Sequence, residues 1–166
     1  HLNIFNNHCD RVQMANLAQT INVLQAVILT EGDKMLLTPT YHVFNMFKVH
    51  QDAELLPLLI DSENYTMDGQ SIPKISSSAS IDKKNILHIT LCNLHPAEEE
   101  KITCYSPGKR FKKISGEILT ADRMNAYNTF ENPFEVKPEP FGEFCLREGE
   151  INIVLPAKSV AVLTLE

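Results

Sequence analysis

Residues 8–23 read HCDRVQMANLAQTINV and residues 37–44 read LTPTYHVF, and these two stretches decide how the first part of the chain is interpreted. Asp10 followed by Gln13 has the character of a capping box, so propensity alone allows a helix to begin there. In the second stretch, Thr38 suits a helix cap and Pro39 suits a first helical turn. Apolar residues follow at helical spacing, which predicts a helix over residues 38–50.

The pattern of the chain changes near Asp52. Short alternating runs follow, separated by Pro, Gly, Asn and Ser, as is typical of an antiparallel β-sandwich. The expected strands lie near residues 55–60, 74–81, 86–94, 101–106, 112–120, 143–147, 150–155 and 159–165. The expected turns between them are Asp68-Gly69, Ser106-Pro107-Gly108, Asn132-Pro133 and Glu148-Gly149.

The segment from Arg123 to Phe141 is expected to be a long loop packed over a sheet. It holds Pro133, Pro138 and Pro140. Proline cannot donate a hydrogen bond to a strand ladder, so a strand is not expected there.

The net charge of −6 and a pI near 5.5 argue against binding of nucleic acid. The basic cluster Lys109-Arg110 with Lys112-Lys113 is short and is interpreted as a solvated turn. No apolar run approaches the length of about 18 residues that predicts a membrane span. At 166 residues the chain is too short for a whole (β/α)8 barrel, which needs about 250. Since the chain begins with His1, its natural N-terminus is expected to be missing, and the compartment, whether cytoplasmic, periplasmic or extracellular, cannot be read from it.

The two opening stretches, together with Lys48-Val49-His50-Gln51, resemble the end of the catalytic barrel in family-51 glycoside hydrolases, the α-L-arabinofuranosidases. The resemblance implies that Val12 to Leu17 is the last strand of a (β/α)8 barrel and that residues 38–50 are its last helix. The fold class expected is therefore mainly β, a jelly-roll-like antiparallel sandwich preceded by the last strand and helix of a barrel. Residues 1–52 would be the tail of the barrel and residues 53–166 the C-terminal sandwich domain.

The resemblance also implies an exo-acting enzyme that removes terminal arabinose from arabinan or arabinoxylan with retention. Such enzymes use no metal or organic cofactor and often form homo-oligomers. Their two catalytic glutamates lie on earlier barrel strands, so we expect no catalytic residue in this chain. The competing hypothesis is a stand-alone sandwich that binds carbohydrate or protein, although the chain has no Trp and only 7% aromatic residues.

Gln19 is the residue that matches the substrate-binding set of the family. The resemblance places it just past the last barrel strand, where barrel enzymes carry their active-site groups, and implies a hydrogen bond to arabinose. A neutral amide can donate to one sugar hydroxyl and accept from another. Without the resemblance, a glutamine that satisfies backbone groups at a strand end is the simpler interpretation. Asn22 and Gln25 follow in the same expected loop and are secondary candidates.

Other groups are weaker candidates. His8, Asp10 and Arg11 are adjacent in sequence, so their side chains are not expected to converge on one point. The acidic run Glu98-Glu99-Glu100 is interpreted as a solvated face rather than a catalytic pair. The four cysteines have no metal-ligand spacing and are expected to be buried free thiols, with a Cys92–Cys104 bridge left open.

Overall fold

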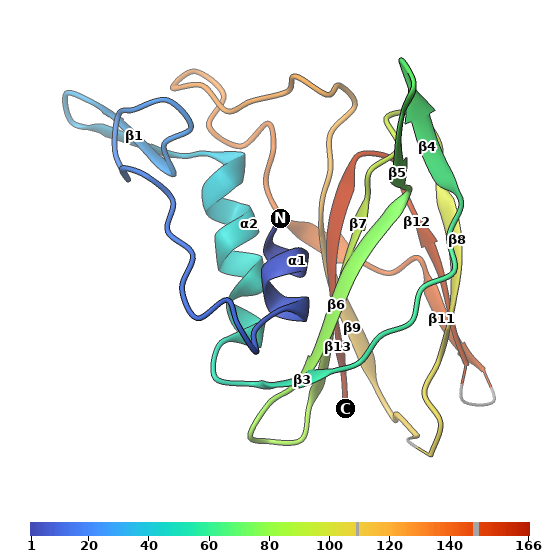
Figure 1. Ribbon diagram of the computed structural model, residues 1–166. Helices are drawn as coiled ribbons and strands as arrows, with labels where there is room; N and C mark the ends of the chain where they lie inside the picture. The colour runs from blue at the N-terminus through green and yellow to red at the C-terminus, as the bar shows by residue number, and fades with distance from the viewer. Residues whose placement is uncertain (109, 148–149) are drawn as a thin grey trace.

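The computed structural model describes residues 1–108, 110–147 and 150–166, and over these residues it forms a sandwich of a larger and a smaller antiparallel sheet (Figure 1). In spatial order, the larger sheet contains β10 (Glu139–Phe141), β9 (Ile114–Leu119), β13 (Ser159–Leu165), β7 (Leu87–Asn93), β6 (Ile75–Ile81) and β3 (Glu54–Leu56). The smaller sheet contains β11 (Phe144–Arg147), β12 (Glu150–Leu155) and β8 (Glu100–Tyr105). The predicted sandwich is confirmed.

The main core lies between the two sheets. Strand β12 alternates, with Ile151, Ile153 and Leu155 at most 1% exposed, and strand β13 contributes Leu163 and Leu165, which are fully buried. Side chains of successive strand residues point to opposite faces, so each strand supplies every second residue to this core. Burial of such side chains is the main source of stability in a sandwich.

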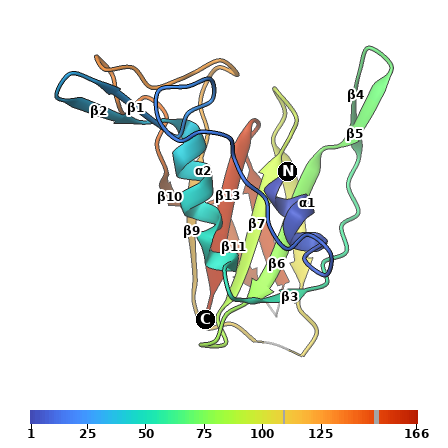
Figure 2. The same cartoon turned by 60° about the vertical axis from the view of Figure 1, so that its left-hand side comes forward.

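The outer face of the larger sheet is also covered, by α1 (Leu2–Asn7), α2 (Pro39–Phe47) and the short 3₁₀ helix η1 (Lys48–His50). Figure 2 shows both α-helices in front of β13, β7 and β6. Met46 and Phe47 form a second apolar cluster with Leu119, Val136 and Val162. The central strands are therefore buried on both faces, which explains why β7 is buried almost throughout.

Helix α1 meets the sheet through polar side chains. Asn3 is 2% exposed, and its Oδ1 atom accepts hydrogen bonds from Ser78 Oγ (2.8 Å) and Thr90 Oγ1 (2.6 Å). Asn6 Nδ2 donates to Ser78 Oγ at 3.0 Å, and Asn7 Nδ2 donates to the Ser77 carbonyl at 2.9 Å. The serines of β6 therefore serve as hydrogen-bond partners for α1, in a place where apolar packing would be usual.

Two small hairpins project from the sandwich. The first joins β1 (Ile28–Glu31) to β2 (Lys34–Leu37), and the second joins β4 (Asn64–Met67) to β5 (Gln70–Pro73). The predicted turn at Asp68-Gly69 is confirmed: both residues have positive φ, at 50° and 75°, as a type I′ hairpin turn requires. The sequence patterns predict no strand in either hairpin.

The predicted helix is confirmed as α2 followed by η1. Thr38 Oγ1 accepts a hydrogen bond from the Tyr41 N–H at 3.4 Å, and Pro39 occupies the first turn. None of the helices in the described part of the chain is both long and apolar enough to cross a membrane.

The strand implied for Val12 to Leu17 is absent from the described structure, and that prediction is wrong for this chain. Helix α1 ends at Asn7, and residues 12–17 follow in irregular conformation and are mostly exposed. Gln13 does not cap a helix; its Nε2 atom donates to the Cys9 carbonyl at 2.9 Å. A parallel strand needs hydrogen-bond partners on a neighbouring strand. Among the described residues, no strand lies beside Val12–Leu17 to provide them.

Two smaller predictions are corrected. The loop expected from Arg123 to Phe141 ends in a short strand, β10, where Pro140 is tolerated because β10 is an edge strand. Cys92 and Cys104 are largely buried free thiols whose pKa values are raised by burial, that of Cys92 to about 11, whereas Cys9 and Cys145 are exposed. The turn expected at Glu148-Gly149, and Lys109 of the basic cluster, lie outside the described residues.

Candidate functional site

The loop of residues 19–27 has an unusual backbone. Gln19, Asn22 and Gln25 all have positive φ, at 55°, 54° and 61°. Such left-handed conformations are uncommon for residues other than glycine and often occur where function demands a particular geometry. Between Gln19 and Asn22 the chain runs beside β1, with Ile21 forming a parallel bridge to Ile28.

Gln19 lines a hollow of about 370 Å³ between this loop and α2. Its other lining residues are Leu17, Thr20, Val27, Tyr41, Phe44, Asn45 and Lys48. The wall combines apolar and aromatic surface with amide, hydroxyl and ammonium groups. Lys48 Nζ donates to Asn45 Oδ1 at 2.9 Å, which leaves the Asn45 Nδ2 group to donate elsewhere. Such a surface can hydrogen-bond a polyhydroxylated ligand while offering it apolar contact.

The sequence patterns do not identify Tyr41, Phe44, Asn45 or Lys48 as binding residues. Tyr41, Phe44 and Asn45 lie on α2, and Lys48 follows directly at the start of η1. Phe44 and Asn45 come three and four positions after Tyr41, and Lys48 comes four and three positions after them, so the four residues share one face. Their spacing follows directly from the predicted helix. The contact between this face and the Gln19 loop could not be predicted from the sequence, because it depends on how the chain folds back through β1 and β2.

The secondary candidates do not share the hollow. Asn22 turns its side chain to Thr30 of β1, and Gln25 is exposed and outside the set of lining residues. His8 and Arg11 are exposed and in contact, with Nδ1 and Nη2 3.4 Å apart.

The acidic run after Pro96 belongs to an ion cluster around Lys74. Lys74 Nζ lies 3.0 Å from Glu63, 3.2 Å from Glu98 and 3.0 Å from Glu100. These contacts, of which the hydrogen bond that Lys74 donates to Glu63 has the largest effect, raise the pKa of Lys74 above its usual value. Glu98 and Glu100 thus hold a cation of their own chain, an arrangement suited to fixing the base of the β4–β5 hairpin rather than to acid–base chemistry.

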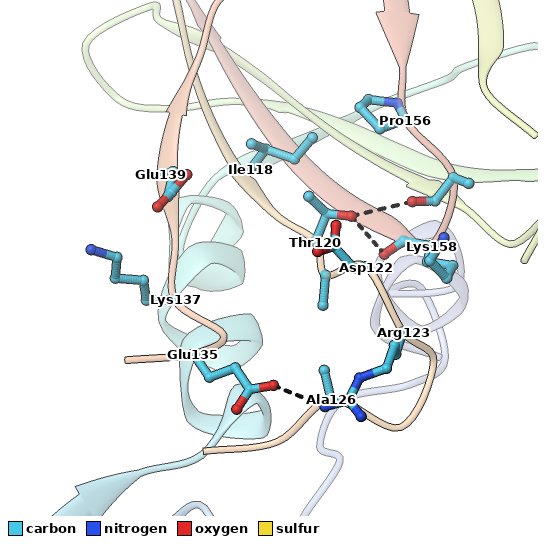
Figure 3. A pocket seen from close by; sticks show the side chains of 12 residues that line it. Ile118, Thr120, Asp122, Arg123, Ala126, Glu135, Lys137, Glu139, Pro156 and Lys158 are labelled. Carbon is cyan, nitrogen blue, oxygen red and sulfur yellow. Dashed lines mark hydrogen bonds and ion pairs between the residues drawn. The ribbon is translucent and has the colours of Figure 1, made fainter. Parts of the chain in front are cut away.

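A second cavity, of about 710 Å³, lies beneath the long loop before β10 (Figure 3). Its lining carries both charge signs, and Arg123 Nη2 pairs with Glu135 Oε1 at 3.3 Å across the loop. Thr120 Oγ1 donates to the Ala157 carbonyl at 3.2 Å on the opposite wall. Gln19 is not among its lining residues, so this cavity is separate from the candidate site.

The chain is similar to known proteins over nearly its whole length. A family model described as "Alpha-L-arabinofuranosidase C-terminal domain" matches residues 1–159. The intracellular exo-alpha-L-arabinofuranosidase of Bacteroides ovatus is 45% identical over 166 residues, covering 99% of this chain and 32% of that protein.

Solved structures give the same result. The GH51 arabinofuranosidase from Xanthomonas axonopodis pv. citri is 40% identical with a TM-score of 0.95, covering 99% of this chain and 33% of that one. The alpha-L-arabinofuranosidase of Thermotoga maritima, solved as an arabinose complex, is 27% identical with a TM-score of 0.86, covering 98% and 36%. This chain therefore spans about a third of the length of these relatives. With the resemblance thus confirmed, the chain belongs to the α-L-arabinofuranosidase C-terminal domain family.

Proposed function

We propose that this chain is the C-terminal part of an exo-acting α-L-arabinofuranosidase, which hydrolyses terminal α-L-arabinofuranosyl residues of arabinan or arabinoxylan with retention. The 45% identity to an enzyme named an exo-alpha-L-arabinofuranosidase, over nearly all of this chain, supports this assignment. The substrate would be an arabinose-containing polysaccharide or oligosaccharide.

The requirements of the reaction indicate which part of the enzyme carries the catalytic residues. Retaining hydrolysis needs two carboxyl groups about 5 to 5.5 Å apart, one as nucleophile and one as acid and base. In the described residues, Glu98 and Glu100 are engaged with Lys74. The proposal therefore assigns both catalytic glutamates to the part of the enzyme that precedes this domain, and assigns one rim of the active site to the Gln19 loop and α2.

Gln19 would hydrogen-bond the arabinose in the subsite beside the catalytic pair. The observation that carries this role is its place in the wall of the hollow, together with Tyr41 and Asn45. Because the amide is uncharged, it can fix the orientation of the sugar without adding a charge that would shift the pKa values of nearby carboxyl groups.

Hydrolysis of an aryl α-L-arabinofuranoside tests the proposal. The full-length enzyme should be active and the 166-residue chain inactive. In the full-length enzyme, Gln19→Ala should raise the activation free energy by about 1 to 3 kcal/mol, the cost of an unpaired polar partner. Gln25→Ala is the matched control, because Gln25 has the same left-handed backbone but lies outside the hollow.

Two results would contradict the proposal. Unchanged kcat/KM in Gln19→Ala would remove Gln19 from the site. Activity of the isolated chain that disappears on substitution of Glu98, Glu99 or Glu100 would place the chemistry within this domain.

The domain division is also part of the proposal: residues 1–52 complete the barrel and residues 53–166 form the sandwich domain. Exposed apolar side chains in the first segment, including Met14 and Leu24, support it, since a barrel would cover them. Limited proteolysis of the full-length enzyme provides a test. Cleavage near Asp52 that releases a folded 53–166 fragment agrees with the division, whereas initial cleavage elsewhere contradicts it.

A further inference from the structure

The segment Thr20 to Asn22 behaves as a short third strand beside β1. Ile28 N–H donates to the Thr20 carbonyl at 3.2 Å, and Asn22 N–H donates to the Ile28 carbonyl at 3.1 Å. The next residue on the same edge of β1 is Thr30, two positions along. Its N–H donates to Asn22 Oδ1 at 2.7 Å, so a side-chain amide takes the place of the next main-chain carbonyl.

The Asn22 amide makes a second bond with the same residue. Its Nδ2 group donates to Thr30 Oγ1 at 2.9 Å, so both ends of the amide are held by one threonine. The backbone of Asn22 has a φ of 54°, which turns the main chain away from β1 while the side chain continues along it. Asparagine tolerates this left-handed conformation better than most residues.

Packing does not hold this part of the loop. Gln19, Thr20, Ile21 and Asn22 are all exposed. Hydrogen bonds to β1 must therefore fix its conformation, and the Asn22 amide supplies two of them at the last point of contact. Only Thr20 and Ile21 separate Asn22 from Gln19, so a shift at Asn22 passes directly to the backbone of Gln19.

We propose that Asn22 is a positioning residue, which clamps the loop to Thr30 and thereby directs the Gln19 amide toward the sugar. This inference rests on the proposed role of Gln19 in substrate binding. Asn22 itself touches no substrate in this arrangement; it acts through Gln19.

The test uses the full-length enzyme and kinetics on an aryl α-L-arabinofuranoside. Asn22→Gly permits the left-handed backbone but removes both hydrogen bonds. We expect kcat/KM to fall about 10- to 100-fold, mainly through kcat, because a misplaced orienting group costs transition-state stabilisation. Asn22→Asp should restore most of the activity, since a carboxylate can accept from Thr30 N–H and from the rotated Thr30 hydroxyl.

A double-mutant cycle separates a positioning role from a general structural one. If Asn22 acts through Gln19, the Gln19→Ala enzyme should lose little more activity when Asn22→Gly is added. Asn152→Ala is the matched control, because it removes another Thr–Asn bond, from Thr103 Oγ1 to Asn152 Oδ1 at 2.9 Å, in the sandwich. It should leave kcat/KM unchanged. Thr30→Val is the milder variant, which removes one of the two bonds and keeps the backbone donor.

The outcomes are distinguishable. Wild-type kinetics in Asn22→Gly and Thr30→Val, with Gln19→Ala impaired, would overturn the positioning role and leave the proposed function intact. Additive losses in the cycle would also overturn it, because Asn22 would then act independently of Gln19. Wild-type kinetics in Gln19→Ala would overturn the proposed role of Gln19, and with it the positioning role.

Discussion

The Nε2 atom of His50 lies 3.1 Å from Oγ1 of Thr90, and this contact joins η1 to the middle of the larger sheet. Thr90 has one hydroxyl proton, which it donates to Asn3 Oδ1 at 2.6 Å. Its oxygen must therefore accept from His50 Nε2–H, which leaves Nδ1 unprotonated to accept from Ser80 Oγ at 2.6 Å. Both nitrogens of a neutral imidazole are thus satisfied, and the network ties α1 and η1 to β6 and β7.

Acid should weaken this network. Burial, reinforced by the electrostatic influence of nearby His88, lowers the pKa of His50 to about 4 from 6.5. Between pH 6.5 and 4, His50 therefore binds a proton in the unfolded chain but stays neutral in the folded chain. The contribution of His50 to stability is complete above pH 6.5 and is lost as the pH falls toward 4. One proton changes stability by at most about 1.4 kcal/mol per pH unit, and partial exposure of the ring reduces this. Urea unfolding between pH 7 and 4.5 measures the slope.

His50→Gln is the variant for this experiment, because glutamine hydrogen-bonds without titrating in this range. Its stability should depend less on pH than that of the wild type. The comparison also removes the background from His42, whose pKa burial likewise lowers, and from Asp82, whose pKa is lowered by backbone hydrogen bonds from Ile86 and Lys84. Parallel pH profiles for variant and wild type would contradict the neutral assignment of His50.

Thr38 should contribute to stability in two ways. Its hydroxyl oxygen caps α2, and its hydroxyl proton is directed to the Ala26 carbonyl at 2.8 Å. We expect Thr38→Ala to lower the free energy of unfolding by about 1 kcal/mol, the usual cost of a lost cap, and Thr38→Ser to be close to wild type. Urea denaturation monitored by circular dichroism checks both variants. Equal losses in Ala and Ser would indicate that the methyl group, and not the hydroxyl, matters.

The partners of Lys74 should differ in importance. The Glu100 side chain is 20% exposed and that of Glu98 is 61% exposed, although both lie near 3 Å from the ammonium group. Because solvent screens an exposed ion pair more strongly, Glu100→Gln should lower Tm more than Glu98→Gln. Thermal melts at low and at 1 M salt provide the measurement, and added salt should narrow the difference between wild type and each variant. A larger loss from Glu98→Gln would contradict this ranking.

The isolated chain should self-associate through the first segment. Met14 is 78% exposed, Ile21 52% and Leu24 93%. Burial yields about 25 cal/mol per Å² of apolar surface, so a few hundred Å² favours a partner by several kcal/mol before association entropy is subtracted. Sedimentation at micromolar concentration should therefore detect dimers or larger species. Leu24→Glu should shift them toward monomer, whereas Leu59→Glu, at a fully exposed position in the sandwich half of the chain, should not. A monomeric wild type would contradict the prediction.

Much of the sandwich followed from the sequence because its determinants are local. Alternation in residues 150–155 and 159–165 and the left-handed turn at Asp68-Gly69 each specify a strand or a hairpin within a few residues. Thr38 and Pro39 likewise determined where α2 begins, since a cap acts within one turn. The family could be inferred from residues 8–52, and Gln19 was identified by that resemblance alone.

Only the tertiary structure determined the features that depend on contacts between segments distant in the sequence. Residues 12–17 form no strand because a parallel strand exists only beside partners, which the described chain does not provide. Conversely, residues 139–141 pair with β9 despite Pro140, because an edge strand leaves one side free of ladder bonds. The wall that Tyr41 and Asn45 form with Gln19, and the hydrogen bonds that Asn22 makes to Thr30, arise where the chain folds back through β1 and β2. The sequence pattern predicts which face of a helix or strand a residue lies on, whereas tertiary packing determines which other segment contacts that face.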